Sequence, residues 1–162
     1  MRKIGWIGAG IMGQPMVIHL LNKGYEVHVY ARHPERVEQA KNAGAILEES
    51  IESLTSNVDV ICTMVGFPSD VKEVYDVIFS CIEAGKTCID FTTSSPKLAK
   101  ELYTKGKELG VHVLDAPVTG GDTGAKNGTL TVLVGADKED FETLSIVARL
   151  VVVNMSRWRT KS

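Results

Sequence analysis

Three glycines near the start of the chain have a spacing that suits phosphate binding. Gly8, Gly10 and Gly13 follow an apolar run at residues 3–7 and precede an amphipathic stretch at residues 14–23. A pyrophosphate needs backbone N–H groups that point at it and no Cβ in the way, and a glycine turn that opens a helix supplies both. We predict that Gly8 makes the tight turn, Gly10 lets the backbone approach the phosphates and Gly13 lets the helix pack closely on the strand. The spacing alone is common, and the strand before it and the helix after it give it weight.

The residues after the next predicted strand, at 26–30, discriminate between dinucleotides. The NAD form of a dinucleotide-binding domain usually has Asp or Glu there, which accepts hydrogen bonds from the ribose 2′-OH. This chain has Ala31 followed by Arg32, and we expect nothing acidic near Arg32 to repel a 2′-phosphate. A charge-assisted hydrogen bond contributes about 1.5–3 kcal/mol, which corresponds to a preference of roughly ten- to a hundredfold for NADP. We therefore expect NADP rather than NAD, with a solvated surface arginine as the alternative interpretation.

Other candidate contacts follow later strands, at the edge where ligands bind in open parallel sheets. Val65 and Gly66 offer backbone groups to a cofactor, and Thr92 and Thr93 offer hydroxyls. Each of these residues is equally compatible with a plain turn or helix cap. The stretch Asp115-Ala-Pro-Val-Thr-Gly-Gly121 is more informative. Its consecutive glycines beside a hydroxyl expose N–H groups for a small anion such as a carboxylate.

A sheet between two layers of helices would bring these positions to one edge. Apolar runs predict strands over residues 3–7, 26–30, 45–47, 59–65, 86–91, 111–114 and 130–134. Periodic stretches predict helices over residues 14–23, 35–42, 97–109 and 138–147, and two more that are capped by Ser50 and Ser69. This alternation predicts an α/β fold with a doubly wound, mostly parallel, Rossmann-like sheet in a single domain. Residues 115–128 are expected to form a long glycine-rich loop.

Length and composition fit one dinucleotide-binding domain over residues 1–150, followed by an atypical tail at residues 151–162 with no visible partner element. The chain has 162 residues and a net charge of −2, which argues against nucleic acid or an anionic membrane as its main partner. No segment approaches the roughly 18 consecutive apolar residues of a membrane span. Cys62, Cys81 and Cys88 fall in apolar runs, and we interpret them as reduced core thiols of a cytoplasmic protein. No metal site is expected.

Four stretches together resemble one enzyme family. They are Ile7-Gly8-Ala9-Gly10-Ile11-Met12-Gly13-Gln14-Pro15-Met16, Asp90-Phe91-Thr92-Thr93, Asp115-Ala-Pro-Val-Thr-Gly-Gly121 and Ala125-Lys-Asn-Gly-Thr-Leu130. Across residues 1–145 the chain resembles the β-hydroxyacid dehydrogenases, the family of 3-hydroxyisobutyrate dehydrogenase and tartronate semialdehyde reductase. The resemblance implies an oxidoreductase that uses a nicotinamide cofactor and acts on a small hydroxyacid or semialdehyde.

The resemblance also implies roles for individual residues. The cofactor would be contacted by the glycine turn, with Ile11 and Met12, and by Val65, Gly66 and Thr93. Ala31 and Arg32 are a partial match to the Asn-Arg-Thr-like strand end of NADP-dependent members. The substrate carboxylate would be held by Thr119, Gly120 and Gly121, with Thr119 at a position where the family commonly has Ser.

One feature of that family has no match in this chain. Its members continue into a helical domain whose first long helix carries a catalytic Lys, in a Gly-rich Lys-x-x-Asn-Asn context, as general acid or base. The chain ends at Ser162, and Lys161 lies in no such motif, so the catalytic residue is unknown. The substitutes to consider are Lys126, His19, His28, His33 and His112, although core or surface roles are favoured for the histidines.

The sequence is compatible with three functions. The first is a truncated NADP-dependent dehydrogenase of small β-hydroxyacids with low or no activity alone. The second is a cofactor-binding module without turnover, acting as a sensor or a subunit of a complex. The third is another Rossmann reductase that a partner chain completes. Without a helical domain, the apolar residues 151–153 and Trp158 would lack cover, which predicts a homo-oligomer or aggregation.

Overall fold

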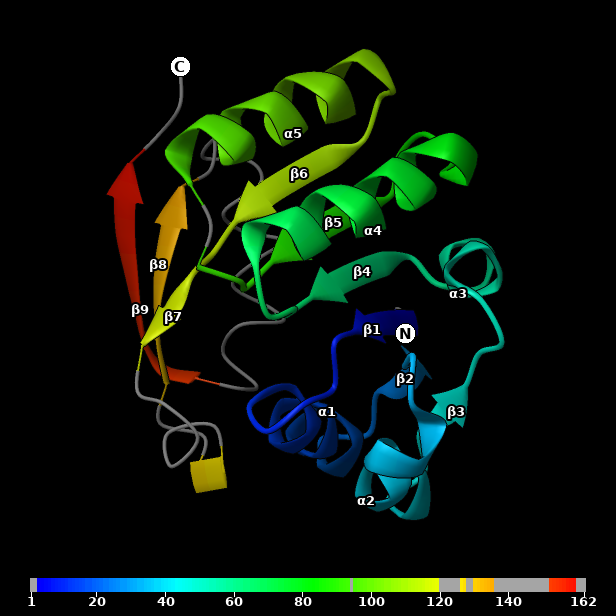
Figure 1. The fold of residues 1–162 in the computed structure, drawn as a ribbon. Helices are drawn as coiled ribbons and strands as arrows, with labels where there is room; N and C mark the ends of the chain where they lie inside the picture. The colour runs from blue at the N-terminus through cyan, green and yellow to red at the C-terminus, as the bar shows by residue number, and fades with distance from the viewer. Residues whose placement is uncertain (1–2, 94, 120–125, 128–129, 136–151, 160–162) are drawn as a thin grey trace.

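A sheet with six parallel strands forms the frame of the fold (Figure 1). The structure, a computed structural model, describes residues 3–93, 95–119, 126–127, 130–135 and 152–159. The parallel strands are β1 (Lys3–Ile7), β2 (Glu26–Tyr30), β3 (Ile46–Leu47), β4 (Val60–Thr63), β5 (Thr87–Asp90) and β6 (His112–Asp115). They lie in the order β3-β2-β1-β4-β5-β6, so the winding of the chain reverses between β1 and β4. This order confirms the predicted doubly wound sheet of the Rossmann type.

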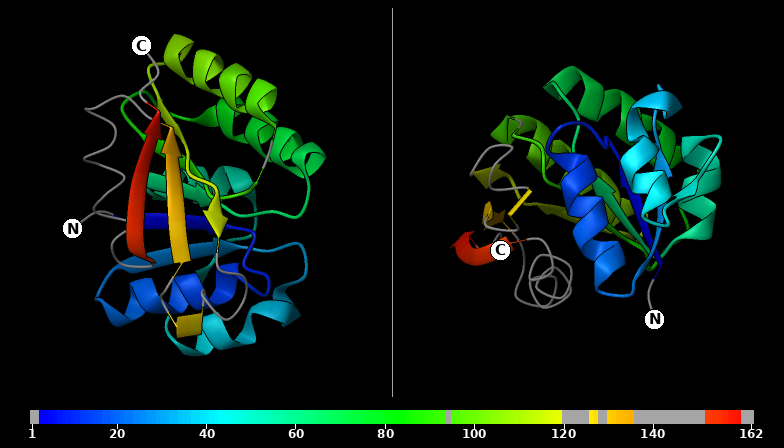
Figure 2. Two further views of the ribbon diagram at one scale, coloured as in Figure 1. Left: turned by 90° about the vertical axis from the view of Figure 1, so that its left-hand side faces the viewer. Right: turned by 90° about the horizontal axis from the view of Figure 1, so that it is seen from below.

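Helices cover both faces of the sheet (Figure 2). They are α1 (Gly13–Asn22), the 3₁₀ helix η1 (Pro34–Val37), α2 (Glu38–Asn42), α3 (Ile51–Asn57), α4 (Pro68–Cys81) and α5 (Pro96–Glu108). Successive residues of a strand point to opposite faces. Val60 and Cys62 of β4 therefore pack in the apolar layer that includes α1 and α2, whereas Ile61 packs in the layer that includes α3, α4 and α5.

Polar residues at the helix starts explain where several helices begin. The Ser50 and Ser95 hydroxyls accept hydrogen bonds from the third residues of α3 and α5, at 3.0 and 3.2 Å. The prediction that Ser69 caps α4 is wrong, because Pro68 is already the first residue of that helix. The Asp70 carboxylate instead accepts a hydrogen bond from the Phe67 N–H at 3.0 Å. Proline suits the first helical position, since its missing N–H would have no partner there.

Further strands extend the sheet beyond β6. β7 (Val118–Thr119) and β8 (Leu130–Gly135) are antiparallel to each other, and β8 also pairs antiparallel with β6. β9 (Val152–Arg159) pairs in parallel with β8, so the expectation that this tail lacks a partner element is wrong. A strand at the edge of a sheet has unpaired backbone N–H and C=O groups, and β9 pairs with those of β8. The long loop expected at 115–128 likewise contains β7. The helix predicted at 138–147 lies outside the described residues, and the division of the chain at residue 150 stays a prediction.

The cysteines only partly follow their expected placement. Cys62 and Cys88 are buried in β4 and β5, as predicted for core thiols. Cys81 is exposed, so its expected place in the core is wrong: it is the last residue of α4, at the end of the helix. In the part of the chain that the structure describes, every helix falls short of the length and apolar character that crossing a bilayer demands.

Candidate functional site

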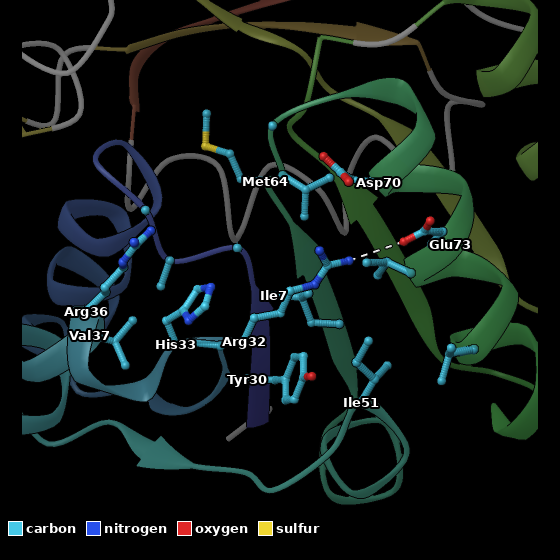
Figure 3. A pocket seen from close by; sticks show the side chains of 18 residues that line it. Ile7, Tyr30, Arg32, His33, Arg36, Val37, Ile51, Met64, Asp70 and Glu73 are labelled. Atoms are coloured by element: carbon cyan, nitrogen blue, oxygen red, sulfur yellow. Dashed lines mark hydrogen bonds and ion pairs between the residues drawn. The ribbon is translucent and has the colours of Figure 1, made fainter.

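A cavity of about 500 Å³ opens at the carboxyl ends of β1, β2 and β4 (Figure 3). It is lined by three loops that follow these strands, at residues 8–10, 31–33 and 64–66, and by one face of α4. This position is where the strand order reverses, and open α/β sheets bind ligands in the crevice at that point. The structure thus brings the glycine turn, Arg32 and Val65 to one cavity, as the sequence predicts.

The three glycines have distinct steric environments. Gly8 has φ of +98°, and a Cβ there would lie 2.0 Å from the Met64 carbonyl oxygen. A Cβ on Gly13 would lie 2.2 Å from the Gly8 carbonyl oxygen, so the first turn of α1 packs directly on the glycine turn. A Cβ on Gly10 would meet nothing within 4 Å. The geometry therefore requires Gly8 and Gly13 for the fold, whereas Gly10 leaves open space beside the N-terminus of α1.

Other predicted cofactor contacts lie around this cavity rather than in its lining. Ile11 is 76% exposed in the turn before α1, and Met12 is half-buried against the core. Thr93 is exposed beyond the end of β5. Thr92 is buried, and its hydroxyl accepts a hydrogen bond from the Val65 N–H at 3.0 Å, so its role is structural.

A buried carboxyl group connects the ends of β4 and β5. Asp90 is 3% exposed and accepts hydrogen bonds from the Thr63 hydroxyl at 2.9 Å and the Thr92 N–H at 3.0 Å. The Thr63 hydroxyl also lies 3.3 Å from the Tyr75 hydroxyl of α4. Burial raises the pKa of Asp90 above its ordinary value, and the hydrogen bonds from Thr92 and Thr63 only partly offset that rise. The network holds the loop that carries Val65 in place beside the cavity.

Arg32 has an acidic partner that the sequence analysis missed. Its Nη2 lies 3.2 Å from Oε2 of Glu73, which α4 carries across the crevice. The expectation that nothing acidic lies near Arg32 is therefore wrong. Glu73 is 41 residues away in the chain, and only the packing of α4 on the sheet brings it close.

The sequence analysis also missed other residues that line the cavity. Figure 3 shows His33 and Arg36 on one side of the cavity, with Asp70 and Glu73 on the other and Arg32 between them. Arg36 follows Arg32 by four residues, in the turn of η1 that Pro34 begins, and that spacing is the signal available in the sequence. The apolar part of the wall includes Tyr30, Ile51, Val74 and Val77.

The structure describes some of the remaining candidate residues but not all of them. Thr119 belongs to β7, whereas Gly120 and Gly121 lie outside the described residues, so the carboxylate site stays a prediction. His28 is buried, and its two ring nitrogens lie 2.7 Å from carboxylate oxygens of Glu26 and Glu48, a structural role. His19 Nε2 lies 3.0 Å from the Lys126 carbonyl oxygen, and neither residue lines the cavity.

Known proteins resemble this chain in sequence and in fold. Residues 3–152 match the model of the NAD binding domain of 6-phosphogluconate dehydrogenase. YkwC, an uncharacterized oxidoreductase of Bacillus subtilis, is 45% identical over 157 residues, which are 95% of this chain and 54% of YkwC. The 2-hydroxy-3-oxopropionate reductase of Escherichia coli is 37% identical over 160 residues, which are 95% of this chain and 53% of the reductase. The solved structure of 3-hydroxyisobutyrate dehydrogenase from Mycobacterium tuberculosis with L-serine has a TM-score of 0.95 and 27% identity, covering 99% of this chain and 55% of that one. The chain spans about half the length of the curated relatives it matches.

Proposed function

Because this chain belongs to the family of the NAD binding domain of 6-phosphogluconate dehydrogenase, we propose that it binds NADP in the crevice at the carboxyl ends of β1, β2 and β4. We further propose that it serves a dehydrogenase of small β-hydroxyacids, of the 3-hydroxyisobutyrate or tartronate semialdehyde type. The observation that carries the proposal is the glycine turn at the start of α1. There, two glycines are required by packing and the third leaves open space.

The pyrophosphate is assigned to the space beside Gly10. α1 has ten residues, but its Gln14 N–H already donates to the Gly10 carbonyl oxygen at 3.0 Å, and Pro15 has no N–H. The N–H groups assigned to the phosphates are therefore those of residues 10–13, in the turn that opens the helix. The positive end of the helix dipole adds to their attraction for an anion. A side chain at position 10 would fill the space that the phosphates need.

The adenosine half is assigned to the region between β2 and α4. Ile51, Val74 and Val77 supply apolar surface of the kind on which a base packs. Arg32 and Arg36 both line this cavity, and two guanidinium groups favour a 2′-phosphate over a 2′-OH. These cations support NADP over NAD as the preferred cofactor.

The nicotinamide half is assigned to the other side of the glycine turn. Ile11, Met12, Val65, Gly66 and Thr93 would contact it, and Thr119, Gly120 and Gly121 would hold the substrate carboxylate beside it. A bound nicotinamide ring supplies or accepts a hydride. The chain's own residues position the ring, and the Val65–Thr92 hydrogen bond keeps one of its contacts in place.

A second candidate function is cofactor binding without turnover. The 162 residues contain no Lys-x-x-Asn-Asn segment. Positioned acid–base catalysis is typically worth ~10²–10⁴-fold in rate. We therefore propose that these residues alone bind cofactor but turn it over slowly. A cytoplasmic location and a homo-oligomeric state also remain proposals.

Binding and turnover measured side by side test both candidates. Residues 1–162 would be titrated with NADPH and with NADH, and NADPH oxidation would be followed with 2-hydroxy-3-oxopropionate. Binding with turnover of ~1–10³ s⁻¹ supports a complete enzyme, whereas binding without turnover supports the second candidate. Equal affinities for the two cofactors would count against the role of Arg32. Absence of binding to either cofactor would overturn both functions.

A further inference from the structure

The ion pair between Arg32 and Glu73 crosses the crevice that the cofactor would enter. Arg32 follows β2, Glu73 lies on α4, and Nη2 and Oε2 are 3.2 Å apart (Figure 3). Both side chains are accessible to a ligand, with 64% and 69% of their surface exposed. Asp70, one turn earlier on α4, also lines the cavity, but its carboxylate already accepts the Phe67 N–H.

We propose that Glu73 is a specificity-determining residue that competes with the 2′-phosphate for Arg32. Glu73 weakens the binding of NADP(H) and leaves the binding of NAD(H) unaffected. It therefore lowers the preference of the crevice for NADP(H) over NAD(H). This inference rests on the proposed function, because it requires the adenosine half of the cofactor to lie between β2 and α4.

The charges in the cavity lead to this conclusion. A phosphate monoester carries about −1.5 to −2 charges at neutral pH, and Arg32 carries one positive charge that Glu73 already partly neutralises. A 2′-phosphate on the same guanidinium would lie close to the Glu73 carboxylate, and the two anions would repel each other. The ribose 2′-OH of NAD carries no charge, so the Glu73 carboxylate does not repel it. Glu73 thus opposes one cofactor and tolerates the other.

A second carboxylate on α4 provides a matched control for Glu73. Asp76 is exposed on the same helix and pairs with Lys72 at 3.2 Å, and it does not line the cavity. Asp76→Asn therefore removes one negative charge from α4 without touching Arg32. Glu73→Gln keeps the shape of an exposed side chain, so the variant should fold as the wild type does.

The test compares Kd values for NADPH and NADH by fluorescence titration of the full chain. Glu73→Gln should raise the ratio of the NADH Kd to the NADPH Kd by about two- to fivefold, as expected for an exposed ion pair. The increase should shrink at high salt because the charges are screened. Asp76→Asn should leave the ratio unchanged.

The outcomes separate the inference from the function on which it rests. Suppose that the wild type binds dinucleotides, but Glu73→Gln does not raise the ratio or Asp76→Asn raises it equally. The inference about Glu73 is then overturned, and the proposed function stands. A rise of the same size when Arg32→Gln is already present would also overturn it, because Glu73 would then act without Arg32. If the wild type binds neither cofactor, both the proposed function and the inference fail.

Discussion

The Val65 N–H donates a hydrogen bond to the Thr92 hydroxyl at 3.0 Å, which joins the loop after β4 to the loop after β5. Thr92 in turn donates its own N–H to Asp90, a carboxyl group buried between the two strands. The cavity wall that carries Val65 is therefore held from inside the sheet rather than by contacts on the surface. Changes to these buried groups should alter both stability and cofactor binding.

Thr92→Val should destabilise the protein by about 1–2 kcal/mol, because the half-buried Val65 N–H loses its acceptor while the side-chain volume stays the same. NADPH binding should weaken as well, since the loop after β4 is released. Urea unfolding and NADPH titration measure the two effects. Thr104→Val is the control, because the Thr104 hydroxyl bonds only within the exposed face of α5. Equal effects of the two substitutions would contradict the role of Thr92.

Asp90→Asn should change how stability depends on pH. Burial raises the pKa of Asp90 above its ordinary value of 3.8. The folded protein then holds this proton more tightly than the unfolded chain does. Wild-type stability therefore falls as the pH rises from about 3.8, where the unfolded chain loses the proton, to the higher pKa of the folded protein. The Asn variant lacks this titration, so its stability relative to wild type should rise with pH. Urea unfolding at a series of pH values measures the difference, and a difference that stays constant with pH would refute the account.

Arg36→Gln should weaken NADPH binding by about three- to tenfold and leave NADH binding nearly unchanged, because a charge-assisted contact to the 2′-phosphate is lost. Arg36 lines the cavity together with Arg32, which is why a second cation is expected to matter. Lys41→Gln removes an exposed positive charge from α2 outside the cavity and serves as the control. A loss that is equal for both cofactors would show that Arg36 does not contact the 2′-phosphate.

Local patterns in the sequence predict much of this fold. The turn at Gly8 and the close packing at Gly13 follow from short-range spacing, and alternating apolar runs and helices predict the sheet. Pro68 even carries the signal for the start of α4, which the choice of Ser69 as a cap overlooked.

Contacts between distant segments could not be predicted in the same way. Glu73 and Arg32 are 41 residues apart, and nothing in either local stretch indicates that they pair. Asp90 accepts a hydrogen bond from the distant Thr63, whose hydroxyl lies within an apolar strand that looks like part of an ordinary core. The pairing of β9 with β8 depends on which strand edge is open, which is a property of the assembled sheet.

If the space beside Gly10 receives the cofactor's phosphates, a methyl group placed there by Gly10→Ala should block binding and leave the fold intact. Gly10 has no positive φ, and a Cβ there meets nothing within 4 Å, so the free energy of unfolding should change by less than about 1 kcal/mol. Gly13→Ala is the contrast, because its Cβ would meet the Gly8 carbonyl oxygen and should destabilise the fold by about 1–3 kcal/mol.

The measurement is a titration of Gly10→Ala with NADPH beside the wild type. We predict a Kd at least about tenfold higher in a variant with wild-type stability, because the added methyl group occupies the place of a phosphate oxygen. A folded Gly10→Ala variant that binds NADPH as tightly as the wild type would contradict the account.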